Sequence, residues 1–596
     1  MSKGKKGARQ PASSRWNLLF AAFMVLALTA GVLAVVTGIM VVPGTHETHD
    51  LRPHKMHASF DAPGQMLRHN QDHKSQFENA YHNAPKNNNI PKTVPKKENE
   101  TNNGDSHNNQ QKNNKPKKYH MVFSTSCSPF QNWQSLAFFY FAHKVKQPGT
   151  VTRLVSGCTD DQAEKLRVIH KERVVPLEIP GLQNFEMHVT PNFDNSKGGD
   201  QKYFNKPNGL LHWMEQSLGF NGKSSHEDDD SIVIIVDPDM MLLRPITDDL
   251  SSKNYAGGWV DTKNTRTHIT EGHDLVDYTN HAVTHGRPHA QEYGYGSGWI
   301  RAVQGHLEEI VGRDSPALKV SLEDAEDYYP AGPPYVATAK DMYQIAIHWV
   351  KFLPKYHDYF QGMMCEMHSY SLAAAHLELP HKLARGFMVS DTDAHGENFD
   401  FVEKKMTKAN VCMSPPNLVQ SDSATPFNAE DSATMTDRAY EQERGIAIRE
   451  LPFVLHFCQR YALGRYFFSK YKLEEDAFDN CEGPLMIEPP RNVAEIYDWN
   501  IFPNGKETYD FSPHPEFDNE YQAFDRKKFQ LRHGWMLCAV VYGVNEAIQA
   551  YKTASCGTDE KYFQKTWHFH DDKEFQQSIK DPSNPFPKDR KAIRTE

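Results

Sequence analysis

The strongest constraint on the fold is the run SIVIIVDPDMMLLRPI, residues 231–246. Its consecutive aliphatic residues, Ile232 to Val236, predict a buried strand. The strand ends abruptly in Asp237-Pro238-Asp239, and Pro238 restricts the backbone between the two carboxylates. Two carboxylates at this spacing could meet one divalent cation. The alternative is that Asp-Pro-Asp simply ends the strand with turn-forming residues.

The N-terminal region predicts a membrane anchor. Leu18 to Val42 is uncharged, mostly apolar, and long enough to cross a hydrocarbon layer of roughly 30 Å. The basic residues that precede it predict a cytosolic tail at 1–17 and a luminal remainder. A signal peptide is the competing interpretation, but its apolar core usually has only about 7–15 residues. A net charge of -10 gives no sign of a nucleic-acid partner.

Residues 43–118 are rich in Asn, His, Lys and Pro and poor in aliphatic residues, which predicts a disordered stem. All eight cysteines follow the anchor, where an oxidising compartment permits disulfides. Because no CxxC spacing occurs, a cysteine zinc site is not expected.

From Tyr119 the pattern is β-α-β. HMVFSTS predicts a strand, a helix opens near Pro129, and Val151 to Cys158 predicts the next strand. This arrangement favours a parallel sheet. A further helix follows Pro207 and leads to the strand that ends at Asp237. Ligands of open α/β sheets bind outside the carboxyl ends of strands, where Asp237 falls.

Further elements are predicted downstream. MMLLRPI and YAGGWVD look extended, and helices are expected at Met342–Val350 and Glu366–His376. Pro452–Tyr461 predicts a short strand that carries His456. Gly534–Lys552 predicts a buried helix, not a second membrane span, and the last residues of the chain are polar.

Several blocks resemble the catalytic domain of plant and algal peptidyl serine α-galactosyltransferases and, less closely, hydroxyproline O-arabinosyltransferases. They are FSTSCSPFQNWQSLAFFYFAHKVKQPGTVTRLVSGC, NKPNGLLHWME, VDPDMMLLRPI, the Glu366-Met367 helix and the pair His456-Phe457. The resemblance spans roughly Tyr119 to Tyr471. The chain departs from the pattern by long insertions, for example 264–288 and 417–434. Its Asp-Pro-Asp is nearer the arabinosyltransferase form, whereas Cys127 is nearer the galactosyltransferase form.

The resemblance implies an α/β, GT-A-like (Rossmann-like) nucleotide-sugar-binding domain at 119–475. A C-terminal extension at 476–596 would pack on it and end in a polar tail. The protein would be a single-pass type II enzyme of the Golgi or endoplasmic reticulum membrane. It would transfer galactose or arabinose from a UDP-sugar to serine or hydroxyproline of secreted proteins.

The predicted site contains five residues. Asp239, with Asp237, would hold Mn²⁺, which stabilises charge on departing UDP, and His456 is the expected third protein ligand. Lys206 could approach the diphosphate as a point charge. Glu366 is the candidate base if the reaction inverts configuration.

Each of these residues also has a structural interpretation. His456 could be a satisfied core histidine, Lys206 an exposed helix-start lysine and Glu366 a hydrogen-bonded buried carboxylate. Asp341 is a weaker base candidate that looks like a helix-start residue. His568 and His570 have metal-binding spacing, but they lie in a polar tail.

Two other classes of protein remain open. A metal-dependent phosphohydrolase would also use paired aspartates, but it would need further Asp and His ligands near the first strand, where only His120 occurs. A non-catalytic luminal protein could also have kept the fold.

Overall fold

A computed structural model describes residues 117–193, 204–222, 226–260, 281–412, 448–501, 508–510 and 520–567, apart from 363, 393, 395, 465, 474, 475 and 498. The chain divides into two units, Met1–Pro85 and Lys86–Glu596, and every described residue belongs to the second. The predicted tail, anchor and most of the stem lie outside the described residues, as do the 417–434 loop, His568 and His570. No helix in these described ranges is both long and apolar enough to cross a membrane.

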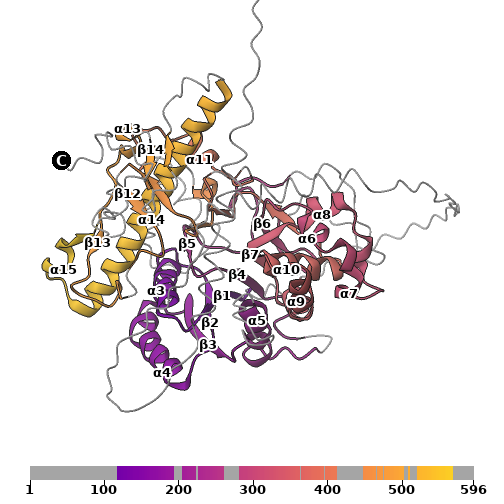
Figure 1. Cartoon of the computed structure of the whole chain (residues 1–596). Helices are drawn as coiled ribbons and strands as arrows, with labels where there is room; N and C mark the ends of the chain where they lie inside the picture. Colours follow the sequence, from indigo (N-terminus) through magenta and orange to yellow (C-terminus); the bar gives the residue numbers. More distant parts are fainter. Residues whose placement is uncertain are drawn as a thin grey trace, which may run out of the picture. The chain divides into compact units, whose positions relative to one another are not determined.

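A seven-stranded mixed sheet forms the centre of this unit (Figure 1). Its strands, in spatial order, are β3 (Gln183–Thr190), β2 (Gly149–Ser156), β1 (Tyr119–Ser126), β4 (Ile232–Val236), β7 (Ala331–Thr338), β6 (His289–Glu292) and β8 (Lys382–Ala384). Strands β1 to β4 are parallel, which confirms the prediction for this half. The sheet as a whole is mixed, because β7 is antiparallel to β4 and β6 is antiparallel to β7. Neither β6 nor β7 was among the predicted strands, so the pattern of the first strands did not indicate the antiparallel half.

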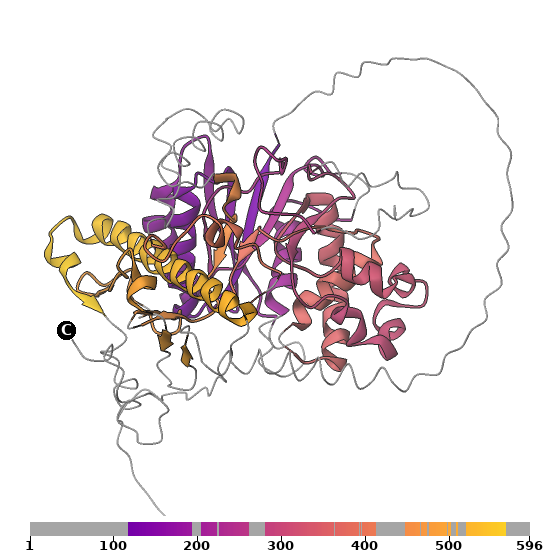
Figure 2. The same cartoon turned by 90° about the horizontal axis from the view of Figure 1, so that it is seen from above.

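Helices cover both faces of the sheet (Figure 2). Side chains of β4 alternate between two cores: Ile232, Ile234 and Val236 pack in one, and Val233 and Ile235 in the other. The first core includes α3 (Pro129–Lys144) and α14 (Glu520–Cys556). The second includes α5 (Asn205–Gln216), α9 (Ala339–Tyr359) and α10 (Cys365–His376). This double coverage explains the uninterrupted apolar sequence of β4.

A small second sheet continues from the turn after β4. It consists of β5 (Met240–Leu242), β10 (Val454–His456) and β9 (Met388–Val389), with β10 antiparallel to β5 and parallel to β9. The predicted MMLLRPI strand is therefore only three residues long. YAGGWVD forms no regular strand, and Trp259 makes a single isolated bridge. This segment lies close to the backbone at Gly386, where a Cβ would lie 2.4 Å from Gly257 O, so Gly386 is required for the approach.

The C-terminal extension packs on this core through α14. Its middle is fully buried, including Trp535 and Val540, which confirms the predicted buried helix at Gly534–Lys552. Disulfides Cys412–Cys538 and Cys481–Cys556 tie α14 to the rest of the chain. The smaller elements are α4 (Asp160–Ile169), α6 (Gly298–Arg301), α7 (Leu307–Val311), α8 (Leu322–Tyr328), α11 (Asp400–Glu403), β11 (Tyr461–Leu463), β12 (Tyr466–Phe468), β13 (Leu485–Met486), α13 (Val493–Ile496), β14 (Trp499–Ile501), β15 (Thr508–Asp510), α15 (Lys561–Gln564) and β16 (Thr566–Trp567).

Candidate active site

The turn after β4 places Asp237 and Asp239 at the carboxyl edge of the parallel strands, where open α/β sheets bind ligands. The N–H of Met240 donates to the Asp237 carbonyl at 3.2 Å, and β5 then begins. Strand pairing sets Met240 opposite His456. As a result His456 Nε2 lies 3.1 Å from Asp239 Oδ1, and the N–H of Phe457 donates to the Asp239 carbonyl at 2.9 Å. One strand pairing therefore joins two of the predicted metal ligands.

A lysine connects the other two predicted acidic groups. Lys206, in the first turn of α5, places Nζ 2.7 Å from Asp237 Oδ1 and 3.1 Å from Glu366 Oε2. Glu366 lies in the first turn of α10, and its Oε1 is buried without a hydrogen-bond partner among the described residues. The structure thus brings Lys206, Asp237 and Glu366 together, from three separate elements.

Lys470 is a site residue that the sequence did not indicate. It follows β12, and its Nζ lies 2.5 Å from Asp239 Oδ2. No local pattern distinguishes it, because Lys472 lies two residues further along the same SKYK segment. Asp239 is therefore bracketed by an imidazole on one oxygen and an ammonium on the other.

Opposite charges dominate the electrostatics of this site. Burial alone would raise the pKa of Asp239, but Lys470 and His456 hold it well below its usual range. Burial would likewise lower the pKa of Lys206, and Asp237 and Glu366 raise it instead. Burial and the charge of Asp237 raise the pKa of Glu366, against the opposing effect of Lys206. The six side chains are only 9–18% exposed, so their charges act in a poorly solvated environment.

The donor atoms fit a divalent cation in part. Asp239 Oδ1 and His456 Nε2 are 3.1 Å apart, close to the roughly 3 Å that separates adjacent ligand atoms in an octahedral site. Carboxylate and imidazole are ligands that Mn²⁺ accepts. Across the described ranges, no three His, Cys, Asp or Glu side chains form a ready metal cluster. Asp237 instead holds Lys206, so the predicted three-residue set is not assembled.

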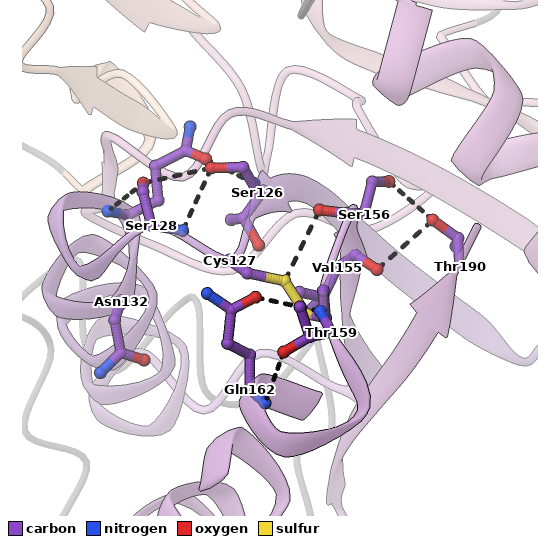
Figure 3. Close-up of a disulfide and its surroundings, with 12 residues drawn as sticks. Ser126, Cys127, Ser128, Asn132, Val155, Ser156, Thr159, Gln162 and Thr190 are labelled. Carbon is purple, nitrogen blue, oxygen red and sulfur yellow. Dashed lines mark hydrogen bonds between the residues drawn. A yellow bond between two sulfur atoms is a disulfide. The ribbon is translucent and has the colours of Figure 1, made fainter. Parts of the chain in front are cut away.

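A disulfide lies at the same edge of the sheet. Cys127 and Cys158 follow β1 and β2, and the bond between them joins the two loops (Figure 3). Hydroxyl groups gather beside it: Ser156 Oγ lies 2.6 Å from Thr190 Oγ1. The sequence held a usable signal, because Cys127 directly follows the first predicted strand, Cys158 is the last residue of the next one, and adjacent parallel strands end side by side.

The remaining candidates have structural roles. Asp341 lies in the first turn of α9, where its N–H donates to Thr338 Oγ1 and its carboxylate accepts from the N–H of Gly286, which confirms a helix-start residue. Trp133 and Trp213 are buried core residues. Three disulfides form in the described part, and Cys365 and Cys458 are free.

Comparison with known proteins confirms the resemblance seen in the sequence blocks. No family model matches the chain. Over 278 residues it is 27% identical to a peptidyl serine α-galactosyltransferase of Arabidopsis thaliana, covering 46% of this chain and 28% of that protein. A protein of the same name from Chlamydomonas reinhardtii is 26% identical over 129 residues, covering 21% and 14%. The chain thus spans less than a third of either relative.

Among solved structures, the bifunctional glycosyltransferase WbbM gives a TM-score of 0.27 at 9% identity, over 57% of this chain and 46% of that one. The galactosyltransferase LgtC, with donor and acceptor sugar analogues, gives 0.25 at 10% identity, over 57% and 87%. At these scores neither structure adds to what the strand order shows: a mixed α/β unit with a largely parallel central sheet.

Proposed function

We propose that this chain is a metal-dependent glycosyltransferase with a GT-A-like domain. It transfers galactose or arabinose from a UDP donor to serine or hydroxyproline hydroxyls of secreted proteins. The proposal depends on one observation: Asp239 contacts His456 at the ligand-binding edge of the sheet. Beside this pair, Lys206 contacts both Asp237 and Glu366. The relatives' names supply the substrate classes.

In this proposal Asp239 and His456 would hold Mn²⁺, with Asp237 bound directly or through water. The metal would supply Lewis-acid stabilisation of the diphosphate leaving group. Lys206 and Lys470 neutralise the aspartates in the structure described here. If a divalent cation were bound to the carboxylates, both ammonium groups could donate to the phosphate oxygens. Metal and nucleotide should therefore bind together, because the diphosphate offsets the added positive charge.

Glu366 takes a role that depends on stereochemistry. In an inverting reaction it accepts the proton of the acceptor hydroxyl, whose oxygen bonds to the sugar carbon as the bond from that carbon to UDP breaks. Burial raises the pKa of Glu366, which makes the carboxylate a stronger base than an exposed one. In a retaining reaction no separate base is needed, and Glu366 positions substrate.

The proposed location is the lumen of the Golgi or endoplasmic reticulum, behind the Leu18–Val42 anchor. The three disulfides fit an oxidising compartment. A phosphohydrolase finds less support, because His120 lies near the start of β1, away from the carboxyl edge, and packs against Trp213.

The test uses full-length protein in detergent with Mn²⁺, a panel of UDP-sugars, and serine- or hydroxyproline-rich peptides. One donor should release UDP and add the corresponding mass to peptide. Asp237→Asn with Asp239→Asn should abolish transfer. The matched control, Asp228→Asn with Asp229→Asn, changes two carboxylates in the loop before the same strand and should leave transfer intact. UDP release without a peptide adduct would favour a hydrolase, and inactivity with every donor would favour a binding protein.

A further inference from the structure

Tyr293 lies at the same edge of the sheet as the aspartates. Strand β7 is antiparallel to β4, and β6 is antiparallel to β7 with Glu292 opposite Ala331. The carboxyl ends of β4 and β6 therefore point the same way. Tyr293 is the first residue after β6, and its N–H donates to the carbonyl of Pro330 at 2.8 Å. This hydrogen bond fixes the position of the Tyr293 backbone at the edge of the sheet.

A glycine supports the aromatic ring. A Cβ added to Gly332 would lie 2.0 Å from both Cδ2 and Cε2 of Tyr293, so the ring packs directly against backbone at that position. The backbone of Gly332 does not itself require glycine, since its φ is outside the left-handed region. The requirement for a small residue comes from the ring.

The hydroxyl group of Tyr293 has a weak partner. It lies 3.6 Å from Met388 Sδ, and a thioether is a poor hydrogen-bond acceptor. Burial, followed by the charge of Asp237, raises the pKa of the phenol well above its usual value, and Asp239 adds to this effect. The hydroxyl is therefore a neutral donor within electrostatic reach of both aspartates, yet the side chain remains partly exposed.

We propose that Tyr293 forms the platform for the transferred sugar of the nucleotide-sugar donor, which deepens and rests on the function proposed above. The sugar is bonded to the phosphate that a metal at Asp237 and Asp239 would hold, so it must lie beside those residues. The aromatic ring of Tyr293 can pack against the C–H groups of a pyranose or furanose, and its hydroxyl can hydrogen-bond to a hydroxyl group of the sugar. UDP lacks that sugar, so changing Tyr293 should lower the activity with the UDP-sugar without changing the affinity for UDP.

The experiment compares UDP binding with sugar transfer in three variants, all in Mn²⁺. Tyr293→Phe removes the hydroxyl, and Gly332→Ala displaces the ring. Gly294→Ala is the matched control, because its Cβ would meet nothing within 4 Å and its φ is ordinary. We expect the Kd for UDP to stay within about twofold in all three. We expect kcat/KM for the UDP-sugar to fall at least about tenfold in the first two only, with thermal unfolding recorded for each protein.

Unchanged transfer in both Tyr293→Phe and Gly332→Ala would overturn the inference while leaving the proposed function intact. A parallel loss of UDP affinity would also overturn it, since the residue would then shape the nucleotide pocket. A wild-type protein that neither binds UDP nor uses any UDP-sugar would instead overturn the proposed function, and the platform with it.

Discussion

His456 Nε2 lies 3.1 Å from Asp239 Oδ1 although 217 residues separate them in the chain. The contact depends on the antiparallel pairing of β5 with β10, which follows directly from the turn after β4. Because backbone hydrogen bonds hold the two residues next to each other, the pair is preorganised for a shared cation. This relationship makes the role of the imidazole directly testable.

Replacing His456 with alanine should weaken metal binding. We expect the Mn²⁺ concentration that gives half-maximal UDP release to rise by roughly ten- to a hundredfold, as losses around metal sites typically do. The control is His188→Ala, which removes a partly buried histidine that bonds another imidazole and no carboxylate. An unchanged Mn²⁺ requirement in His456→Ala would show that the imidazole is only a structural partner of Asp239.

Lys470 should contribute to nucleotide affinity. Lys470→Met keeps the length of the side chain and removes the charge. A charge-assisted hydrogen bond is worth about 1.5–3 kcal/mol, so calorimetry should show UDP binding roughly ten- to a hundredfold weaker. Lys472→Met, two residues away, should bind UDP normally. If Lys470→Met lowers only thermal stability, then Lys470 serves to neutralise buried Asp239.

The sequence predicted the parts of this site that are encoded locally. The buried run Ile232–Val236 and the abrupt Asp237-Pro238-Asp239 are adjacent in the chain, and the structure places the strand at those bounds. The position of Lys470 is different, because it depends on how the hairpin β11–β12 folds over Asp239. Such a contact arises from tertiary packing, and neither composition nor periodicity records it.

The directions of β6 and β7 in the sheet also could not be predicted from local sequence patterns. Every residue of β7 is buried, but Pro333 and Pro334 within it argue against a strand, and no strand was predicted there. Only the register with β4 and β6 shows that Tyr293 reaches the edge that carries Asp237. The sequence therefore could not place Tyr293 in the site.

Glu397 should make stability depend on pH. It accepts hydrogen bonds from Ser390 Oγ at 2.6 Å and from the N–H of Asp391 at 3.1 Å, yet burial raises its pKa from 4.5 to about 7. A raised carboxyl pKa favours folding below the unfolded value, and this contribution is lost as pH rises through the folded value. Between pH 4.5 and 8 the folded protein should lose about 1–3 kcal/mol from this group.

Urea unfolding at pH 5 and pH 8 measures this contribution. Glu397→Gln retains the size of the side chain and cannot ionise, so its free energy of unfolding should fall less between the two pH values than that of the wild type. Glu164→Gln alters an exposed carboxylate and should preserve the wild-type difference. Equal pH dependence in wild type and Glu397→Gln would mean that Glu397 keeps an ordinary pKa.

The disulfide between Cys127 and Cys158 should support nucleotide binding as well as stability. It closes a 31-residue separation, and chain entropy predicts a loss of about 3–4 kcal/mol when both cysteines become serine. Because the bond joins the loops that follow β1 and β2, at the ligand-binding edge, we also expect UDP affinity to fall at least about fivefold. UDP affinity is measured by calorimetry at low temperature, where the variant stays folded.

A second disulfide serves as a control that separates the loss of stability from the loss of UDP affinity. Cys481–Cys556 closes a 75-residue separation and ties the C-terminal end of α14, so its removal should cost a similar or larger amount, about 4–5 kcal/mol. It is remote in sequence from the loops after β1 and β2, and we expect UDP affinity to be unchanged. If both double variants lose UDP affinity equally, then the effect follows global stability and the Cys127–Cys158 bond has no particular role at the site.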